Sequence, residues 1–341
     1  MKKFICKIII ISSIISSFLL IINYYADPGN LFSKSYENEI VDMLKLNNVT
    51  NISNYDERAF QRQFINSLDV KPEIIAIGSS RVAYIDSDFF SDQIFINSGV
   101  SGATIEDLVA IYQMYKSKDI LPKEIILGVD PWLFNINNGQ NRWLSIEKEY
   151  KKYYNKEESK INLGFTILKY TQLFSPSYLQ ASLNLLLTEK KLILTSKKNN
   201  LGRTKLKDGS LVETQAVREI TINQLDDIVK DYIQQKQYSI EGYHRISTDK
   251  FIEFQNLCLD ILENNIKLSF FLSPYHPLVY QKVKQDYGIV LDVEKEIIEF
   301  ANSNNIKLKG SYSPHKVGVI NKDFFDGLHL HKMSTKKILF D

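Results

Sequence analysis

Three side chains in this sequence have the types and surroundings that acyl transfer needs. Ser80 stands in the motif Gly78-Ser79-Ser80-Arg81, which ends a run of apolar residues, and Asp326 and His329 stand three residues apart near the C-terminus. A serine hydroxyl becomes a nucleophile when an imidazole accepts its proton, and a carboxylate fixes the tautomer of that imidazole. We therefore expect Ser80 to be the nucleophile, His329 the base and Asp326 the acid, with Ser79 as a weaker candidate for the nucleophile.

Four further residues are candidates for the oxyanion hole or for substrate contacts, because they stand in loops that follow apolar runs. They are Gly102, Asp130, Arg81 and His276. The backbone N–H groups of Ser80 and Gly102 are the candidate oxyanion donors, since glycine permits close approach. His276 is the candidate for substrate contact, and Arg81 is the candidate cation for neutralising Asp130.

Each candidate also has an ordinary structural interpretation, which the sequence leaves open. Ser80 has the residue type and place of a helix cap. Asp326 is also a typical N-cap, which would leave His329 on the surface, and Gly102 has an alternative role in its backbone angles alone. Asp130 precedes a proline and fits an Asx turn equally well.

Composition argues against several classes of site and partner. The two cysteines, Cys6 and Cys258, offer no disulfide framework, and together with His276, His315 and His331 they show no metal-ligand spacing, so we expect no metal. The sequence contains no Gly-x-Gly-x-x-Gly motif, which predicts that no nucleotide cofactor binds. Forty-two basic and forty acidic side chains give a formal charge of +2, which predicts no nucleic-acid partner.

Short apolar runs alternate with amphipathic stretches on both sides of a central segment. Strands are predicted at Glu73–Gly78, Gln93–Asn97, Glu124–Asp130, Lys267–Leu272 and Ile306–Lys309, and helices at Thr104–Lys116, Thr248–Asn264, Val290–Asn302 and His331–Phe340. This alternation is typical of a parallel sheet with helices on both faces, so we predict a three-layer α/β/α domain over residues 71–341. The loops at the carboxyl ends of such strands meet at one edge of the sheet, and the candidate residues stand in those loops.

Two segments differ from this pattern. Residues from about 135 to 245 are charged and rich in aromatic side chains, with a helical stretch at Ser177–Leu187 and the hairpin signal Asp208-Gly209. We expect them to form a mostly helical insertion that acts as a cap or lid. Residues 26–70 are polar and rich in Asn and Asp, which predicts a linker that holds the domain away from the membrane.

The N-terminal residues predict a membrane anchor. Residues 4–23 are mostly apolar and have the length that crosses a bilayer core, with Lys2 and Lys3 before them and Tyr24 and Tyr25 after them. We therefore expect residues 1–25 to form one spanning helix, with the N-terminus in the cytoplasm and the remaining chain outside. No small-residue cleavage site precedes Tyr24, which favours a retained anchor over a removed signal peptide.

The order of the motifs resembles that of the SGNH/GDSL hydrolase superfamily, over residues 70–341 without the insertion. Gly-x-Ser follows the first strand, Ser-Gly-Ala-Thr the second and Gly-x-acid the third, and Asp-x-x-His stands near the C-terminus. The resemblance implies a flavodoxin-like three-layer fold. It also implies that Ser80 matches the family nucleophile, Gly102 an oxyanion-hole glycine, and Asp326 and His329 the acid and the base.

One block departs from the family pattern. Where the family commonly has Gly-x-Asn, whose side-chain amide donates to the oxyanion, this chain has Gly128-Val129-Asp130. An ionised carboxylate can only accept hydrogen bonds. Either Asp130 is protonated, or it is held by a cation such as Arg81, or the third donor comes from elsewhere.

The anchor and the Gly-Ser-Ser motif are together similar to a narrower group of bacterial envelope proteins, which includes those of teichoic acid D-alanyl transfer and alginate O-acetylation. This resemblance implies an esterase or O-acyltransferase that moves an acyl group between an acylated carrier and a surface glycan, often beside a multi-spanning acyltransferase. Two alternatives stay open. The chain could be an interaction protein of polysaccharide assembly that has lost turnover, or an esterase that only removes acyl groups.

Overall fold

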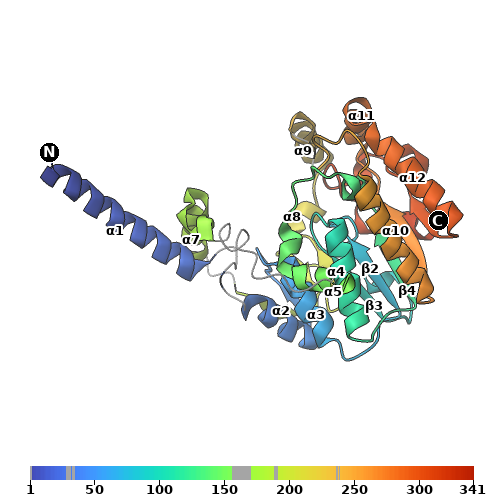
Figure 1. Ribbon diagram of the computed structural model, residues 1–341, viewed down its shortest axis with the longest axis horizontal. Coiled ribbons are helices and arrows are strands. Elements are labelled where there is room, and N and C mark those ends of the chain that lie inside the picture. The colour runs from blue at the N-terminus through green and yellow to red at the C-terminus, as the bar shows by residue number, and fades with distance from the viewer. Residues whose placement is uncertain are drawn as a thin grey trace.

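A five-stranded parallel sheet forms the centre of the large folded body in Figure 1. The computed structural model describes residues 2–27, 32, 35–155, 170–187, 191–235, 237 and 239–341. The strands are β2 (Ile74–Gly78), β3 (Phe95–Gly99), β4 (Glu124–Gly128), β8 (Lys267–Leu272) and β9 (Lys307–Gly310), in the order β3-β2-β4-β8-β9. All four neighbouring pairs are parallel, which confirms the predicted parallel sheet.

Helices cover both faces of this sheet, so neighbouring residues of one strand belong to different cores. Ile75 and Ile77 belong to the larger core, which includes side chains of α4 (Ile105–Ser117), α10 (Thr248–Glu263) and α12 (Ile289–Ser303). Ile74 and Ala76 belong to a smaller core with side chains of α13 (Lys332–Phe340). Each large aliphatic side chain buried in this way contributes about 1.5–3 kcal/mol. Burial on both faces is the reason that the strands read as continuous apolar runs.

The prediction of a linker over residues 26–70 is wrong for residues 35–67. These residues form α2 (Ser35–Leu46), β1 (Asn48–Thr50) and α3 (Glu57–Ser67), and Phe60 and Ile65 of α3 are fully buried in the larger core. Most residues of this segment are polar, so the few apolar residues on one face of α3 did not indicate a buried helix. Even the charged side chain of Arg58 is buried, because it pairs with Asp107 of α4 at 2.9 Å.

A second, antiparallel sheet joins this N-terminal segment to the insertion. Its order is β5-β1-β6-β7, with β5 (Ile193–Thr195), β6 (Thr204–Lys205) and β7 (Leu211–Val212). The predicted hairpin turn at Asp208-Gly209 is confirmed, since β6 and β7 pair on either side of it and Gly209 has a φ of +82°. The insertion is therefore less purely helical than predicted, and its residues 156–169 lie outside the described part of the chain.

The remaining helices include one that the sequence pattern did not indicate, α11 (Pro277–Asp286). The insertion contributes α5 (Glu147–Tyr153), α7 (Pro176–Leu187), α8 (Gln215–Arg218) and α9 (Ile222–Gln234). Short 3-10 turns are η1 (Ser87–Phe89), η2 (Pro131–Phe134), η3 (Arg142–Ile146), η4 (Gln172–Phe174), η5 (His315–Val317) and η6 (Asn321–Asp323).

The N-terminal helix α1 (Lys2–Ala26) extends away from the folded body, with α7 of the insertion beside its C-terminal end (Figure 1). Its residues Phe4–Ala26 are long and apolar enough to cross a membrane. The predicted spanning helix is thus present as a helix of suitable length and composition.

Candidate active site

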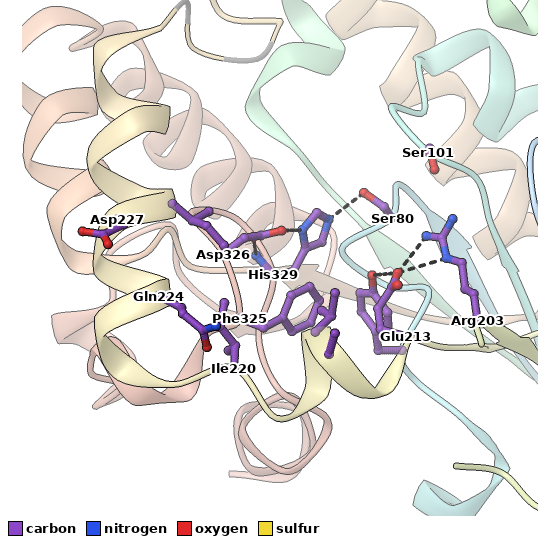
Figure 2. Close-up of a pocket in the computed structure, with 14 residues that line it drawn as sticks. Ser80, Ser101, Arg203, Glu213, Ile220, Gln224, Asp227, Phe325, Asp326 and His329 are labelled. Atoms are coloured by element: carbon purple, nitrogen blue, oxygen red, sulfur yellow. Dashed lines mark hydrogen bonds and ion pairs between the residues drawn. The ribbon is translucent and has the colours of Figure 1, made fainter. Parts of the chain in front are cut away.

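Ser80, His329 and Asp326 lie in one hydrogen-bonded series (Figure 2). The Ser80 Oγ atom is 2.9 Å from Nε2 of His329, and Nδ1 of the same ring is 2.7 Å from Oδ2 of Asp326. When Nδ1 donates to the carboxylate, Nε2 is left to accept the serine proton. The arrangement is that of a nucleophile, its base and the acid that orients the base.

The local backbone at the end of β2 explains why Ser80, and not Ser79, faces the base. Ser79 is fully buried, and its hydroxyl accepts a hydrogen bond from the backbone N–H of Arg81 at 3.2 Å, inside the turn. Gly78 is needed where β2 approaches β4, because a Cβ atom there would lie 3.0 Å from the Cα atom of Gly128. The strand therefore ends in a tight turn that leaves Ser80 at the surface of a cleft.

An Asx turn accounts for the spacing of Asp326 and His329. Oδ1 of Asp326 accepts the backbone N–H groups of Leu328 and His329, at 2.7 and 2.8 Å, while Oδ2 accepts from the imidazole. Burial raises the pKa of Asp326, but the charge of His329 and these hydrogen bonds lower that pKa further, so the net shift is downwards. The carboxyl group therefore stays ionised, as an orienting acid must. It does not begin a helix, since α13 starts at Lys332.

Two aromatic rings hold the imidazole of His329, and sequence reasoning missed both. Phe325 stacks on it with ring centroids 5.5 Å apart and an interplanar angle of 5°. Tyr84 approaches at 83° with centroids 5.8 Å apart, and its hydroxyl donates to Glu213 of the insertion at 3.0 Å. The only sequence signal for these two rings was their position: Phe325 directly precedes Asp326, and Tyr84 follows Ser80 by four residues.

Arg81 and Asp130 form a buried ion pair, which selects one of the open alternatives for Asp130. Nη1 of Arg81 is 3.0 Å from Oδ1 of Asp130, and both side chains are almost fully buried. Nη2 donates to the carbonyls of Ser273 and Pro274 at 2.5 and 2.7 Å, and Nε donates to that of Leu328 at 3.3 Å. Asp130 accepts from a guanidinium, and neither side chain lines the cleft. The expected pairing of Arg81 with Asp130 is therefore present, and a contact of either residue with the oxyanion or the substrate stays a prediction.

Gly102 lies in the loop after β3 that also brings Ser101 to the cleft. Gly102 has a φ of +57°, and the carbonyls of Ser101 and Gly102 accept hydrogen bonds from Arg58 at 3.0 and 3.5 Å. Glu57 of α3 accepts both the backbone N–H and the hydroxyl of Ser101. Within the described residues, the N–H groups of Ser80 and Gly102 donate no hydrogen bond. The N–H group of Gly102 thus stays a candidate oxyanion donor. The positive φ of this residue is a second, purely conformational reason for a glycine at this position.

His276 is fully buried and does not reach the cleft, so the prediction of substrate contact is wrong. Its side chain caps α11, with Nδ1 accepting the backbone N–H of Leu278 at 3.3 Å. Burial lowers the pKa of His276 to about 4, so the ring is neutral near pH 7. Its Nε2 atom has no hydrogen-bond partner among the described residues.

A cleft of about 750 Å³ opens at the triad, and the insertion forms its opposite wall. The β6–β7 hairpin contributes the ion pair of Arg203 and Glu213 at 2.8 Å, and the segment after it contributes Val217, Ile220 and Ile228. The predicted role of the insertion as a cap agrees with this placement. Nothing local in the sequence connects Arg203 with Ser80, since they meet only through the second sheet.

Neither a model of a known protein family nor a curated protein matches this chain. Within the described ranges, no group of three or more His, Cys, Asp or Glu side chains is placed to hold a metal ion. The evidence for the chemistry of the site is therefore its own geometry, the hydrogen-bonded series of Ser80, His329 and Asp326.

Proposed function

We propose that this protein is a membrane-anchored, SGNH-like serine esterase or O-acyltransferase that acts on a cell-envelope polysaccharide outside the cytoplasmic membrane. The observation that carries the proposal is the hydrogen-bonded series from Ser80 through His329 to Asp326, at the mouth of an open cleft. Two further features support it. The strand order, counted along the main sheet as 2-1-3-4-5, is that of flavodoxin-like sheets, and α1 supplies a helix long enough to span the membrane.

In the proposed reaction, Nε2 of His329 takes the proton of Ser80 while Oγ attacks the acyl carbonyl carbon. The N–H groups of Ser80 and Gly102 donate to the oxyanion, and His329 then gives its proton to the departing oxygen, which leaves an acyl-enzyme. In the second step a sugar hydroxyl or water gives its proton to His329 and attacks the acyl carbon, the bond from that carbon to Oγ of Ser80 breaks, and His329 returns the proton to Oγ. Asp326 stabilises the imidazolium in both steps.

The acyl donor is proposed to be an acylated carrier or a multi-spanning acyltransferase in the same membrane, and the acceptor a surface glycan. The volume of the cleft, about 750 Å³, is within the range of small-molecule sites, so it can hold an acyl group together with a sugar unit. Apolar side chains of the insertion line the same cleft as the triad and offer contacts for an acyl chain or a sugar face.

One observation favours a second candidate, an interaction protein of polysaccharide assembly without turnover. Asp130 stands where the family carries an amide donor, and its pairing with Arg81 leaves the site without that donor. Complementation separates the two functions. A Ser80→Ala chain that restores glycan modification in a deletion strain would favour the interaction protein.

Labelling with an active-site serine phosphonate tests the proposed nucleophile in the full chain. We expect the wild-type protein to be labelled and Ser80→Ala to lose the label. Ser303→Ala is the matched control, because Ser303 ends α12 and its hydroxyl donates to the backbone of its own helix. Undiminished labelling of Ser80→Ala would remove Ser80 from the mechanism.

A further inference from the structure

The helix α7 carries an apolar surface and no charged residue, which is unusual for a helix outside the core. Its sequence is PSYLQASLNLLL, and Leu183 and Leu186 are exposed by 44% and 60%. Phe174, two residues before the first residue of α7, is exposed by 61%. A patch of this kind on a protein in water marks a contact surface. By contrast, α9 of the same insertion carries Asp226, Asp227, Lys230 and Asp231.

Polar side chains attach α7 to the C-terminal end of α1. Asn23 of α1 is fully buried; its amide donates to the carbonyl of Leu173 at 2.8 Å and its oxygen accepts from the hydroxyl of Ser182 at 2.9 Å. Directly after α1, Asp27 accepts from the hydroxyl of Tyr178 at 2.7 Å. Hydrogen bonds of this kind join helices where water is scarce.

The two pairs of contacts fix the direction in which α7 runs. Tyr178 meets Asp27 and Ser182 meets Asn23, so the two helices are antiparallel, and Leu186 lies one turn deeper along the apolar part of α1. Burial along α1 agrees with this register. Residues 11–18 are exposed, whereas Leu19 and Leu20 are partly covered.

Aromatic rings gather at the same level of α1. Tyr24 contacts Tyr25 and Phe32, with centroids 5.8 and 5.3 Å apart, and Phe32 contacts Tyr170 before η4 at 5.5 Å. Tyrosine side chains are enriched where a membrane meets water, because the ring is apolar and the hydroxyl is polar. The cluster therefore places the interface at the end of α1 to which α7 is attached.

We propose that α7 enters the lipid leaflet on the side of the folded body, alongside α1, and forms a second membrane contact of this protein. The apolar face with Leu183 and Leu186 is then covered by lipid, and the hydrogen bonds to Asn23 and Asp27 satisfy the polar groups at the interface. The inference depends on α1 crossing the bilayer and is independent of the chemistry at Ser80.

This contact holds the cleft close to the membrane. Leu187 and Lys191 are four residues apart, so their Cα atoms are separated by at most about 14 Å. Lys191 leads into β5, which belongs to the same sheet as the β6–β7 hairpin. Arg203 and Glu213 of the cleft wall stand directly beside strands β6 and β7 of this sheet, so α7 connects the cleft wall to the leaflet at a second point besides α1.

Spin labels on the full chain in vesicles of phosphatidylethanolamine and phosphatidylglycerol test the proposal. Cys6→Ser gives a suitable background, since the other cysteine, Cys258, is buried. Single cysteines replace Leu186 in α7, Ile15 in the middle of α1 and Ile222 in α9, which are exposed by 60%, 61% and 49%. Frequent collisions of a spin label with dissolved oxygen show that the label lies in lipid, and frequent collisions with a water-soluble nickel chelate show that it lies in water.

We expect the Leu186→Cys label to resemble the Ile15→Cys label, with severalfold fewer nickel collisions than the Ile222→Cys label. A Leu186→Cys label that collides with nickel as often as the Ile222→Cys label would overturn the lipid contact, and would leave the face to a protein partner. A water-exposed Ile15→Cys label would overturn the anchor and the inference together. Phosphonate labelling of Ser80 in the same vesicles reads out the proposed chemistry separately.

Discussion

At the scale of single residues, the site depends on a side chain that does not touch the cleft. Arg81 follows Ser80 directly, and its guanidinium reaches the ends of two other strands through Asp130 and the carbonyls of Ser273 and Pro274. Its Nε donates to the carbonyl of Leu328, the residue before His329. One planar group thus fixes the loop of Ser80 relative to the loop of His329. We regard Arg81 as a positioning residue.

Arg81→Lys tests this role. Lysine keeps the charge but lacks the planar fork, so several buried acceptors lose their donor. We expect the free energy of unfolding to fall by about 3 kcal/mol, and phosphonate labelling of the folded protein to slow by roughly 10- to 100-fold, because small misplacements of a base are costly. Tryptophan fluorescence during thermal unfolding and the labelling rate measure the two effects.

The exposed Arg142, whose Nη2 donates to Gln140 on the surface, offers the matched control. Arg142→Lys is expected to change stability by less than about 0.5 kcal/mol. Unchanged labelling by a folded Arg81→Lys protein would show that Arg81 contributes only to stability.

At the scale of elements, the sequence predicted what is encoded locally. All five strands of the main sheet were predicted within two residues, because strands buried on both faces are continuous apolar runs. The pair Asp326 and His329 could be expected from its local spacing, whereas Ser80 was expected from its place after the first strand and from the resemblance of its motif. By contrast, α3 was missed, since its buried Arg58 is satisfied by Asp107 and by the carbonyls of Ser101 and Gly102, and these contacts join distant segments of the chain. The same holds for Arg203 in the cleft wall.

The β6–β7 hairpin is the element that joins this wall to the main sheet. The carbonyl of Asp208 accepts from the backbone N–H of Asn97 at 2.7 Å, and a Cβ atom on Gly209 would lie 2.5 Å from the carbonyl oxygen of Asn97. We expect Gly209→Ala to cost about 3 kcal/mol of stability, through both the left-handed backbone and this clash. Thermal unfolding of the full chain measures it.

Gly139 is the matched control for that substitution. It also has a positive φ, +68°, but a Cβ atom there meets nothing within 4 Å. Gly139→Ala should therefore cost only the backbone strain, about 1 kcal/mol. Equal effects of the two substitutions would mean that the close approach of the hairpin to β3 contributes nothing.

At the scale of the whole molecule, a surface glycan can be the substrate only if the folded body lies on the outer side of the membrane. α1 extends away from that body (Figure 1). Lys2, Lys3 and Lys7 all stand in the first half of its sequence. Positive charge marks the cytoplasmic end of a spanning helix. The body, at the other end, would then meet surface polysaccharide and no cytoplasmic acyl acceptor.

Labelling with a membrane-impermeant thiol reagent tests this orientation in intact cells. In the Cys6→Ser background, the remaining Cys258 is buried, and burial raises the pKa of its thiol well above the usual value, so it stays unreactive. We expect a cysteine at Ser303, on the folded body, to react in intact cells, and a cysteine at Lys2 to react only after permeabilisation. The opposite pattern would place the body in the cytoplasm and exclude a surface glycan as its substrate, whatever the reactivity of Ser80.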